Sequence, residues 1–160
     1  MNEVIAFINQ QSPETKILIG SDSERNKIKG RWMADYMVVV VVHIDGSKGC
    51  KLYGEVTREP DYDQKKDKPA MRLMNEVYKV AEIYNQIAEL IDDREMSVHL
   101  DINPKEIHGS SCVIQQAVGY IRGVCNVIPL VKPNAPAASF AADRLKRVLE
   151  EQDADELARA

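Results

Sequence analysis

The chain has 160 residues, of which 44% are hydrophobic and 29% are charged. This length is typical of one domain, and the composition excludes collagen-like, low-complexity and wholly disordered chains. The longest apolar run, residues 37–42, is far shorter than the roughly 20 residues that span a bilayer. Because the N-terminus lacks a basic region followed by an apolar stretch, we expect no secretory signal.

Charge is distributed unevenly along the chain. Residues 150–160 carry a net charge of −4, which equals that of the whole chain, so residues 1–149 are neutral. A neutral body with an acidic tail gives no overall signal for nucleic acid, and such a site has to be a local patch. The three cysteines, Cys50, Cys112 and Cys125, contain no C-x-x-C pair, which indicates reduced thiols and a cytoplasmic location.

Hydrophobic periodicity predicts a helix, three strands, and then alternating helices and strands. We expect helices over residues 2–10, 69–92, 110–123 and 136–151, and strands over residues 16–22, 33–44, 50–57, 96–101 and 126–132. Residues 24–31 and 59–68 are charged and are expected to form loops. Asp45 and Gly46 between two strands predict a hairpin, and Pro129 indicates that the last strand lies at a sheet edge.

These elements favour the α/β class. A hairpin implies antiparallel pairing, whereas long helices between the later strands imply parallel crossovers. We therefore predict a mixed five-stranded sheet flanked by helices. A single domain is expected over residues 1–160, with a core at about residues 16–151 and an acidic C-terminal tail at residues 150–160.

Two aspartates each close a short hydrophobic strand. Asp22 follows the first strand and Asp101 the fourth. If these strands are parallel neighbours, the two carboxylates emerge side by side at the carboxyl edge of the sheet, where α/β proteins form their sites. Their mutual repulsion would be relieved by a divalent cation, and Mg²⁺ prefers a few carboxylates. The alternative for either residue alone is an ordinary turn former.

Two more acids lie on helices. Glu76 falls near the edge of the apolar stripe of its helix, where it can reach the rim of the sheet, although a solvated helix-edge charge is the alternative. Asp143 lies about two turns into the last helix, away from the apolar side. It can instead pair with Lys146 or Arg147 at helical spacing.

The order of these four acids resembles the ribonuclease H-like superfamily. A closer resemblance, to the YkuK-like bacterial proteins, is carried by three short segments: residues 19–23 (IGSDS), 99–102 (HLDI) and 131–139 (VKPNAPAAS). The resemblance implies a ribonuclease H-like fold with Asp22, Glu76 and Asp101 as the acidic core. Asp143 is implied as the less constant fourth acid, with Asp155 as a competitor.

The resemblance further implies a metal-dependent endonuclease that hydrolyses phosphodiester bonds by a two-metal mechanism. Two Mg²⁺ or Mn²⁺ ions would be bound by the four acids. Nucleic acid is the expected partner: RNA, an RNA–DNA hybrid or structured DNA. Asn134 departs from the acid expected in close relatives, and no basic substrate-gripping insertion is present.

Several cations are candidates for holding phosphates at the rim of the site. The substrate-binding candidates are Arg25, Lys27, Lys29 and Lys132, with further lysines at Lys65, Lys66 and Lys68 and arginines at Arg144 and Arg147. Solvated loop charge is the alternative for each group. His99 shares a strand face with Asp101 and is a possible auxiliary residue, although a buried structural histidine is the alternative. His108 is a candidate proton shuttle.

Two other functional classes remain open from the sequence. A non-catalytic nucleic-acid- or protein-binding domain with a ribonuclease H-like fold agrees with the acidic tail. A zinc protein is less compatible with the pattern, because the histidines and cysteines are scattered without ligand spacing. The sequence leaves the oligomeric state and the exact substrate open.

Overall fold

The computed structural model describes residues 1–63 and 66–159. Residues 64 and 65, which include the predicted phosphate-binding candidate Lys65 and belong to the loop predicted over residues 59–68, lie outside the described residues, as does residue 160. The elements, in chain order, are α1 (Asn2–Asn9), β1 (Lys16–Ile28), β2 (Arg31–His43), the 3-10 helix η1 (Ile44–Gly46), β3 (Cys50–Pro60), α2 (Ala70–Ala88), β4 (Met96–Leu100), the 3-10 helix η2 (Gly109–Val113), α3 (Ile114–Cys125), β5 (Leu130–Val131) and α4 (Pro136–Arg159).

The strands form one mixed sheet in the order β3-β2-β1-β4-β5. β2 pairs antiparallel with β1 and with β3, whereas β4 is parallel to both β1 and β5. The α/β class and the mixed five-stranded sheet flanked by helices are thus confirmed. β5 lies at the edge of the sheet, in agreement with the position of Pro129. This order makes β1 and β4 parallel neighbours at the centre.

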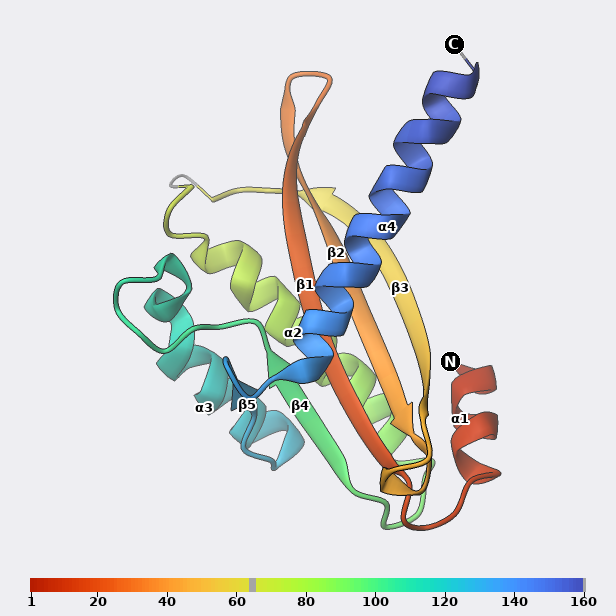
Figure 1. Ribbon diagram of the computed structural model, residues 1–160. Helices are drawn as coiled ribbons and strands as arrows, with labels where there is room; N and C mark the ends of the chain where they lie inside the picture. The colour runs from red at the N-terminus through yellow and green to blue at the C-terminus, as the bar shows by residue number, and fades with distance from the viewer. Residues whose placement is uncertain (64–65, 160) are drawn as a thin grey trace.

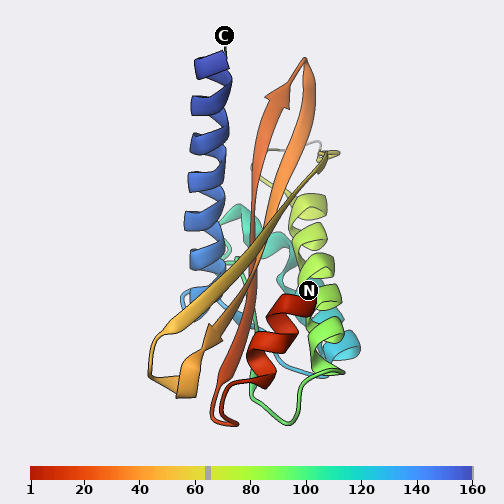
Figure 2. The same ribbon diagram turned by 90° about the vertical axis from the view of Figure 1, so that its right-hand side faces the viewer.

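Helices cover both faces of the sheet (Figures 1 and 2). α1, α2 and α3 pack on one face, where Ile17 and Ile19 of β1 share a buried cluster with Val77 and Val80 of α2. α4 lies alone on the other face. Its apolar side, which includes Ala141 and Leu145, packs against Met37, Val39 and Val41 of β2. Burial of these apolar side chains on both faces is the main force that holds the layers together.

The first turn of α4 approaches β1 unusually closely at Gly20. A Cβ atom on Gly20 would lie 2.5 Å from the carbonyl carbon of Ala137 and 2.6 Å from the nitrogen of Ala138. Only glycine leaves room for two backbones at this distance. The start of α4 is therefore fixed next to the first half of β1, two residues before Asp22.

Residues 24–31 form a hairpin, and the prediction of a loop is wrong. β1 continues to Ile28 and β2 begins at Arg31. Lys29 and Gly30 make the turn with φ values of 47° and 81°. Two residues with positive φ are typical of a type I′ hairpin turn. The sequence pattern did not reveal the strands because the tip of the hairpin projects beyond α2 and α3 (Figure 1) and therefore lacks an apolar alternation.

Helix ends also differ from the prediction. α4 continues to Arg159 instead of ending near residue 151, because the last segment contains strong helix formers and no glycine or proline. α3 ends at Cys125 with Asn126 as a left-handed cap (φ 56°), so Gly123 lies inside the helix. α2 ends at Ala88, one turn earlier than predicted. Within the described residues, no helix has the length and hydrophobicity required to cross a bilayer.

Candidate functional site

Asp22 and Asp101 come together because β1 and β4 are parallel. Gly20 pairs with His99 in the register of these strands, and each aspartate follows two residues later. Burial raises the pKa of the Asp22 carboxyl to about 7, with further contributions from the charge of Asp101 and a hydrogen bond with it. The two carboxyl groups therefore share one location, beside the middle of β1 and just beyond the end of β4.

Glu76 reaches the same location from α2. It is buried, and burial raises its pKa to about 8, with the charges of Asp22 and Asp101 adding to the shift. The Ser23 hydroxyl donates a hydrogen bond to its carboxylate. Arg72 in turn donates to the carbonyl oxygen and the hydroxyl oxygen of Ser23, each at 2.8 Å. Three acids from β1, α2 and the end of β4 thus influence one another.

A lysine neutralises one of these acids. The Lys132 ammonium forms an ion pair with the Asp101 carboxylate. Its backbone is fixed as well, because the Lys132 N–H donates to the carbonyl oxygen of Ile102 at 3.1 Å. The charge of Lys132 also lowers the pKa of Asp22, against the larger effects that raise it. Lys132, which the sequence predicts as a phosphate contact, therefore lies at the acids themselves.

Among the described residues, no contact joins Asp143 to the three acids. Its side chain is exposed, and it lies two residues from each of the buried residues Ala141 and Leu145, which places it on the other side of α4. Asp155 is also exposed, near the end of α4. The fourth acid therefore stays a prediction.

The two candidate histidines occupy different environments. His99 is buried, its Nδ1 accepts a hydrogen bond from the Ala137 N–H at 3.1 Å, and its Nε2 lies 2.9 Å from the Ser97 hydroxyl. Burial lowers the pKa of His99 to about 4, so the ring is neutral at pH 7. It joins β4 to the start of α4. His108 is exposed in the segment before η2, and its proposed proton transfer stays a prediction.

Among the predicted phosphate contacts, Arg25 is engaged inside the protein. Its Nε lies 2.8 Å from a buried oxygen of Asp61, and its guanidinium stacks 4.2 Å from the ring centre of Trp32. It also donates to the carbonyl oxygen of Asp63 at 3.0 Å. Lys27 and Lys29, in contrast, are exposed on the hairpin. Arg25 thus ties the hairpin to the segment before α2.

Asp61 and Asp63 are structural residues that the sequence pattern did not reveal. Asp63 caps α2, because its two carboxylate oxygens accept hydrogen bonds from the N–H groups of Met71 and Arg72, both at 2.9 Å. Asp61 accepts a hydrogen bond from the Asp63 N–H at 3.0 Å. A capping residue seven positions before the helix gives no local signal, because caps are normally adjacent to the first turn.

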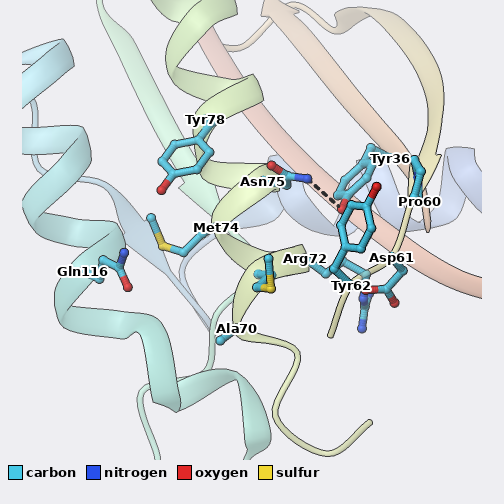
Figure 3. A pocket seen from close by; sticks show the side chains of 11 residues that line it. Tyr36, Pro60, Asp61, Tyr62, Ala70, Arg72, Met74, Asn75, Tyr78 and Gln116 are labelled. Atoms are coloured by element: carbon cyan, nitrogen blue, oxygen red, sulfur yellow. Dashed lines mark hydrogen bonds between the residues drawn. The ribbon is translucent and has the colours of Figure 1, made fainter. Parts of the chain in front are cut away.

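An open pocket of about 270 Å³ lies over the first half of α2 (Figure 3). Tyr36 and Tyr62 line one side, whereas Tyr78 and Gln116 line the other. Tyr36 itself is buried, and its hydroxyl accepts a hydrogen bond from the Asn75 amide at 3.2 Å. Asp22, Glu76 and Asp101 do not line this pocket, so it is separate from the carboxylates.

The donor set at the acids suits a hard cation. Carboxylate oxygens are the ligands that Mg²⁺ and Mn²⁺ prefer. In the part of the chain that the structure describes, however, no three His, Cys, Asp or Glu side chains converge closely enough to ligate one ion. Glu76 is held by Ser23 and Asp101 by Lys132. The chemistry of the residues therefore fits a metal, and a common site for one ion requires these side chains to move closer together.

A family model described as ribonuclease H-like matches residues 1–147. The chain belongs to the ribonuclease H-like family. This membership agrees with the mixed sheet and its flanking helices, and the family suggests a nuclease-like or nucleic-acid-binding fold. The narrower resemblance to YkuK-like proteins stays a prediction. Comparisons with curated proteins and with solved structures found no match. The matched region includes Asp22, Glu76, Asp101 and Asp143, and it ends before the exposed last turns of α4.

Proposed function

We propose that this ribonuclease H-like protein is a divalent-metal-dependent endonuclease that hydrolyses phosphodiester bonds of RNA or an RNA–DNA hybrid. The observation that supports it is the meeting of Asp22, Glu76 and Asp101, three acids from three elements whose charges oppose one another. Bringing like charges together costs free energy, and a fold retains such an arrangement at functional sites more often than elsewhere. A cation offsets this cost.

Asp22 has the central role in this proposal. It interacts with Glu76 and with Asp101, so it is the residue best placed to contact two ions. Bound Mg²⁺ or Mn²⁺ would supply an activated water and stabilise the leaving oxygen. Glu76 would contribute to holding the ions from α2, and Asp101 from the end of β4. Asp143, which is exposed in this structure, would complete the set from α4.

Exposed cations define where the nucleic acid would lie. Lys27 and Lys29 stand on the hairpin, and Arg144 and Arg147 are exposed on α4. A phosphate backbone that runs between the hairpin and α4 would pass Asp22 in the middle of β1. Such contacts position a strand without reading its sequence, and they weaken as salt concentration rises.

The test is a cleavage assay on single-stranded RNA, an RNA–DNA hybrid and duplex DNA, with Mg²⁺, Mn²⁺ or a chelator. Asp22→Asn and Asp101→Asn should each lower kcat by roughly 100-fold or more while the protein stays folded. Asp93→Asn is a matched control, because Asp93 is exposed and precedes β4, whereas Asp101 follows the other end of that strand. Equal cleavage by the wild type and both site variants would contradict the proposal.

A non-catalytic nucleic-acid-binding role is the second candidate. Two contacts favour this role, because they satisfy the acids without a metal. One is the ion pair of Lys132 with Asp101, and the other is the hydrogen bond from Ser23 to Glu76. The melting temperature distinguishes the two roles. Mn²⁺ should raise the Tm of a metal-dependent nuclease, and Asp22→Asn should remove that shift. Binding of nucleic acid with neither cleavage nor a metal-induced shift would favour the second candidate.

A further inference from the structure

Lys132 is placed at Asp101 by the backbone rather than by a flexible side chain alone. β4 and β5 are parallel, with Leu100 opposite Val131, so the next residue on each strand is Asp101 and Lys132. The hydrogen bond from the Lys132 N–H to the carbonyl oxygen of Ile102 continues this register beyond the strands. The ion pair is therefore part of the sheet edge.

The same lysine offsets more than one negative charge. Besides its contact with Asp101, it is the cation whose charge lowers the pKa of Asp22. On the side of α2, Arg72 donates to the Ser23 hydroxyl oxygen, and Ser23 in turn donates to Glu76. The charge of Arg72 also acts on Glu76. Among the contacts of the described residues, the ion pair with Lys132 is the one that places a cation directly on Asp101.

We propose that Lys132 is an internal counter-ion that competes with a divalent cation for the Asp101 carboxylate. The inference rests on the proposed function, since it concerns metal binding at the same acids. Lys132 contacts the Oδ1 atom of Asp101. A divalent cation on this carboxylate would lie close to the ammonium group, and the two positive charges repel. This repulsion favours displacement of Lys132, so the free energy of the ion pair is subtracted from the metal affinity.

The consequence is that loss of the lysine charge tightens metal binding. The Lys132 side chain is 44% exposed and that of Asp101 is 21% exposed, so the pair is only partly shielded from water. Pairs of this kind have modest strength, and their loss should strengthen metal binding by roughly three- to tenfold. A lysine that instead orients Asp101 for the metal would give the opposite result.

The experiment is a calorimetric titration of Mn²⁺ into the full chain, without nucleic acid. Lys132→Gln should bind Mn²⁺ more tightly than the wild type, and Lys132→Arg should keep the wild-type affinity. Lys16→Gln is the matched control, because Lys16 pairs with Glu95 at the opposite end of the sheet and its side chain is 46% exposed. It should leave the affinity unchanged.

A measurement on the wild type avoids reliance on any variant. The side-chain nitrogen resonance of Lys132 should shift when Mg²⁺ is added, while that of Lys16 stays in place. An unchanged or weaker Mn²⁺ affinity in Lys132→Gln, or an unmoved Lys132 resonance at saturating Mg²⁺, would overturn the inference.

The outcomes also separate this inference from the proposed function. Wild-type binding that Asp22→Asn abolishes, combined with unchanged affinity in Lys132→Gln, overturns the role of Lys132 alone. Binding by Lys132→Gln but not by the wild type supports the competition strongly. The absence of binding in both proteins overturns the inference and the metal-dependent function together.

Discussion

The imidazole of His99 connects two layers of the molecule. Its Nδ1 accepts from the Ala137 N–H of α4, which assigns the ring proton to Nε2, the atom that faces the Ser97 hydroxyl. The first N–H groups of a helix have no partner within the helix, so a side-chain acceptor here satisfies a group that would otherwise be buried and unpaired. His99 is thus a structural residue next to the site.

We predict that His99→Ala destabilises the protein by about 2–4 kcal/mol, since it removes a buried ring and leaves the Ala137 N–H without its acceptor. His99→Asn should recover part of the loss, because the amide oxygen can occupy the position of Nδ1. Urea unfolding at pH 7 measures both values. A loss below about 0.5 kcal/mol in His99→Ala would show that the contact has no structural importance.

At this scale, the sequence could predict proximities that follow from strand order, but not contacts between distant loops. Asp22 lies within β1 and Asp101 follows β4. The helix before β4 favours parallel pairing of these strands, so the proximity of the two acids was predictable. The substrate contact of Arg25 stays a prediction. Its ion pair with Asp61, which lies far along the chain in a segment without periodicity, was not predicted. Such a pairing depends on where the hairpin meets the loop, which no local pattern specifies.

Among the elements, the hairpin and α4 determine the surroundings of the acids. The strands with buried apolar residues were predictable from their patterns, whereas the hairpin tip and the end of α4 were not, because both are solvated. α4 is anchored by the buried residues Ala137, Ala141 and Leu145 and by the half-buried Val148 and Leu149. Its position next to the acids depends on the close approach at Gly20.

We predict that Gly20→Ala destabilises the protein by about 1–3 kcal/mol or more, because the added methyl group would overlap the backbone of Ala137 and Ala138. Gly119→Ala is the matched control. Gly119 lies inside α3, and a Cβ there meets no atom within 4 Å, so that substitution should stabilise by about 0.5–1 kcal/mol. Thermal or urea unfolding of both variants tests the contrast, and two equal effects would contradict it.

The end of α4 should contribute little to stability. Residues 150–159 are exposed, so they bury almost no apolar surface. Removal of residues 151–160 is expected to change the Tm by no more than about 2 °C and to leave any Mn²⁺-induced shift intact. Differential scanning fluorimetry with and without Mn²⁺ provides the measurement. A large loss of Tm would mean that the acidic segment stabilises the body of the protein.

For the whole molecule, the important property is the burial of several ionisable groups at the centre of the sheet. Glu76 and Asp22 have pKa values raised to about 8 and 7, so the folded protein keeps protons that the unfolded chain releases above pH 4–5. His99 has the opposite effect, because its pKa is lowered to about 4 and only the unfolded chain takes up a proton below pH 6.5. These groups give the metal-free protein a characteristic pH dependence.

The direction in which stability changes with pH follows from each group in turn. A carboxyl group whose pKa is raised by folding contributes its full stability below its pKa in the unfolded chain. That contribution is lost as the pH rises through its pKa in the folded protein. The lowered pKa of His99 removes stability as the pH falls from about 6.5 to about 4, which partly cancels the acid effect in that range. Above pH 6.5 the cancellation ends, and the metal-free protein should lose stability up to about pH 8.

We predict that the free energy of unfolding of the metal-free protein falls by on the order of 2 kcal/mol between pH 6.5 and pH 8.5. In Glu76→Gln most of this fall should disappear, because the amide has no proton to lose and its oxygen can still accept from Ser23. Saturating Mn²⁺ should also restore stability at pH 8.5 in the wild type, but not in Asp22→Asn. Urea unfolding in chelator and in Mn²⁺ at both pH values measures all three effects. A flat profile in the metal-free wild type would show that the three carboxylates do not share one buried location, and a metal-dependent site at these acids would lose its physical basis.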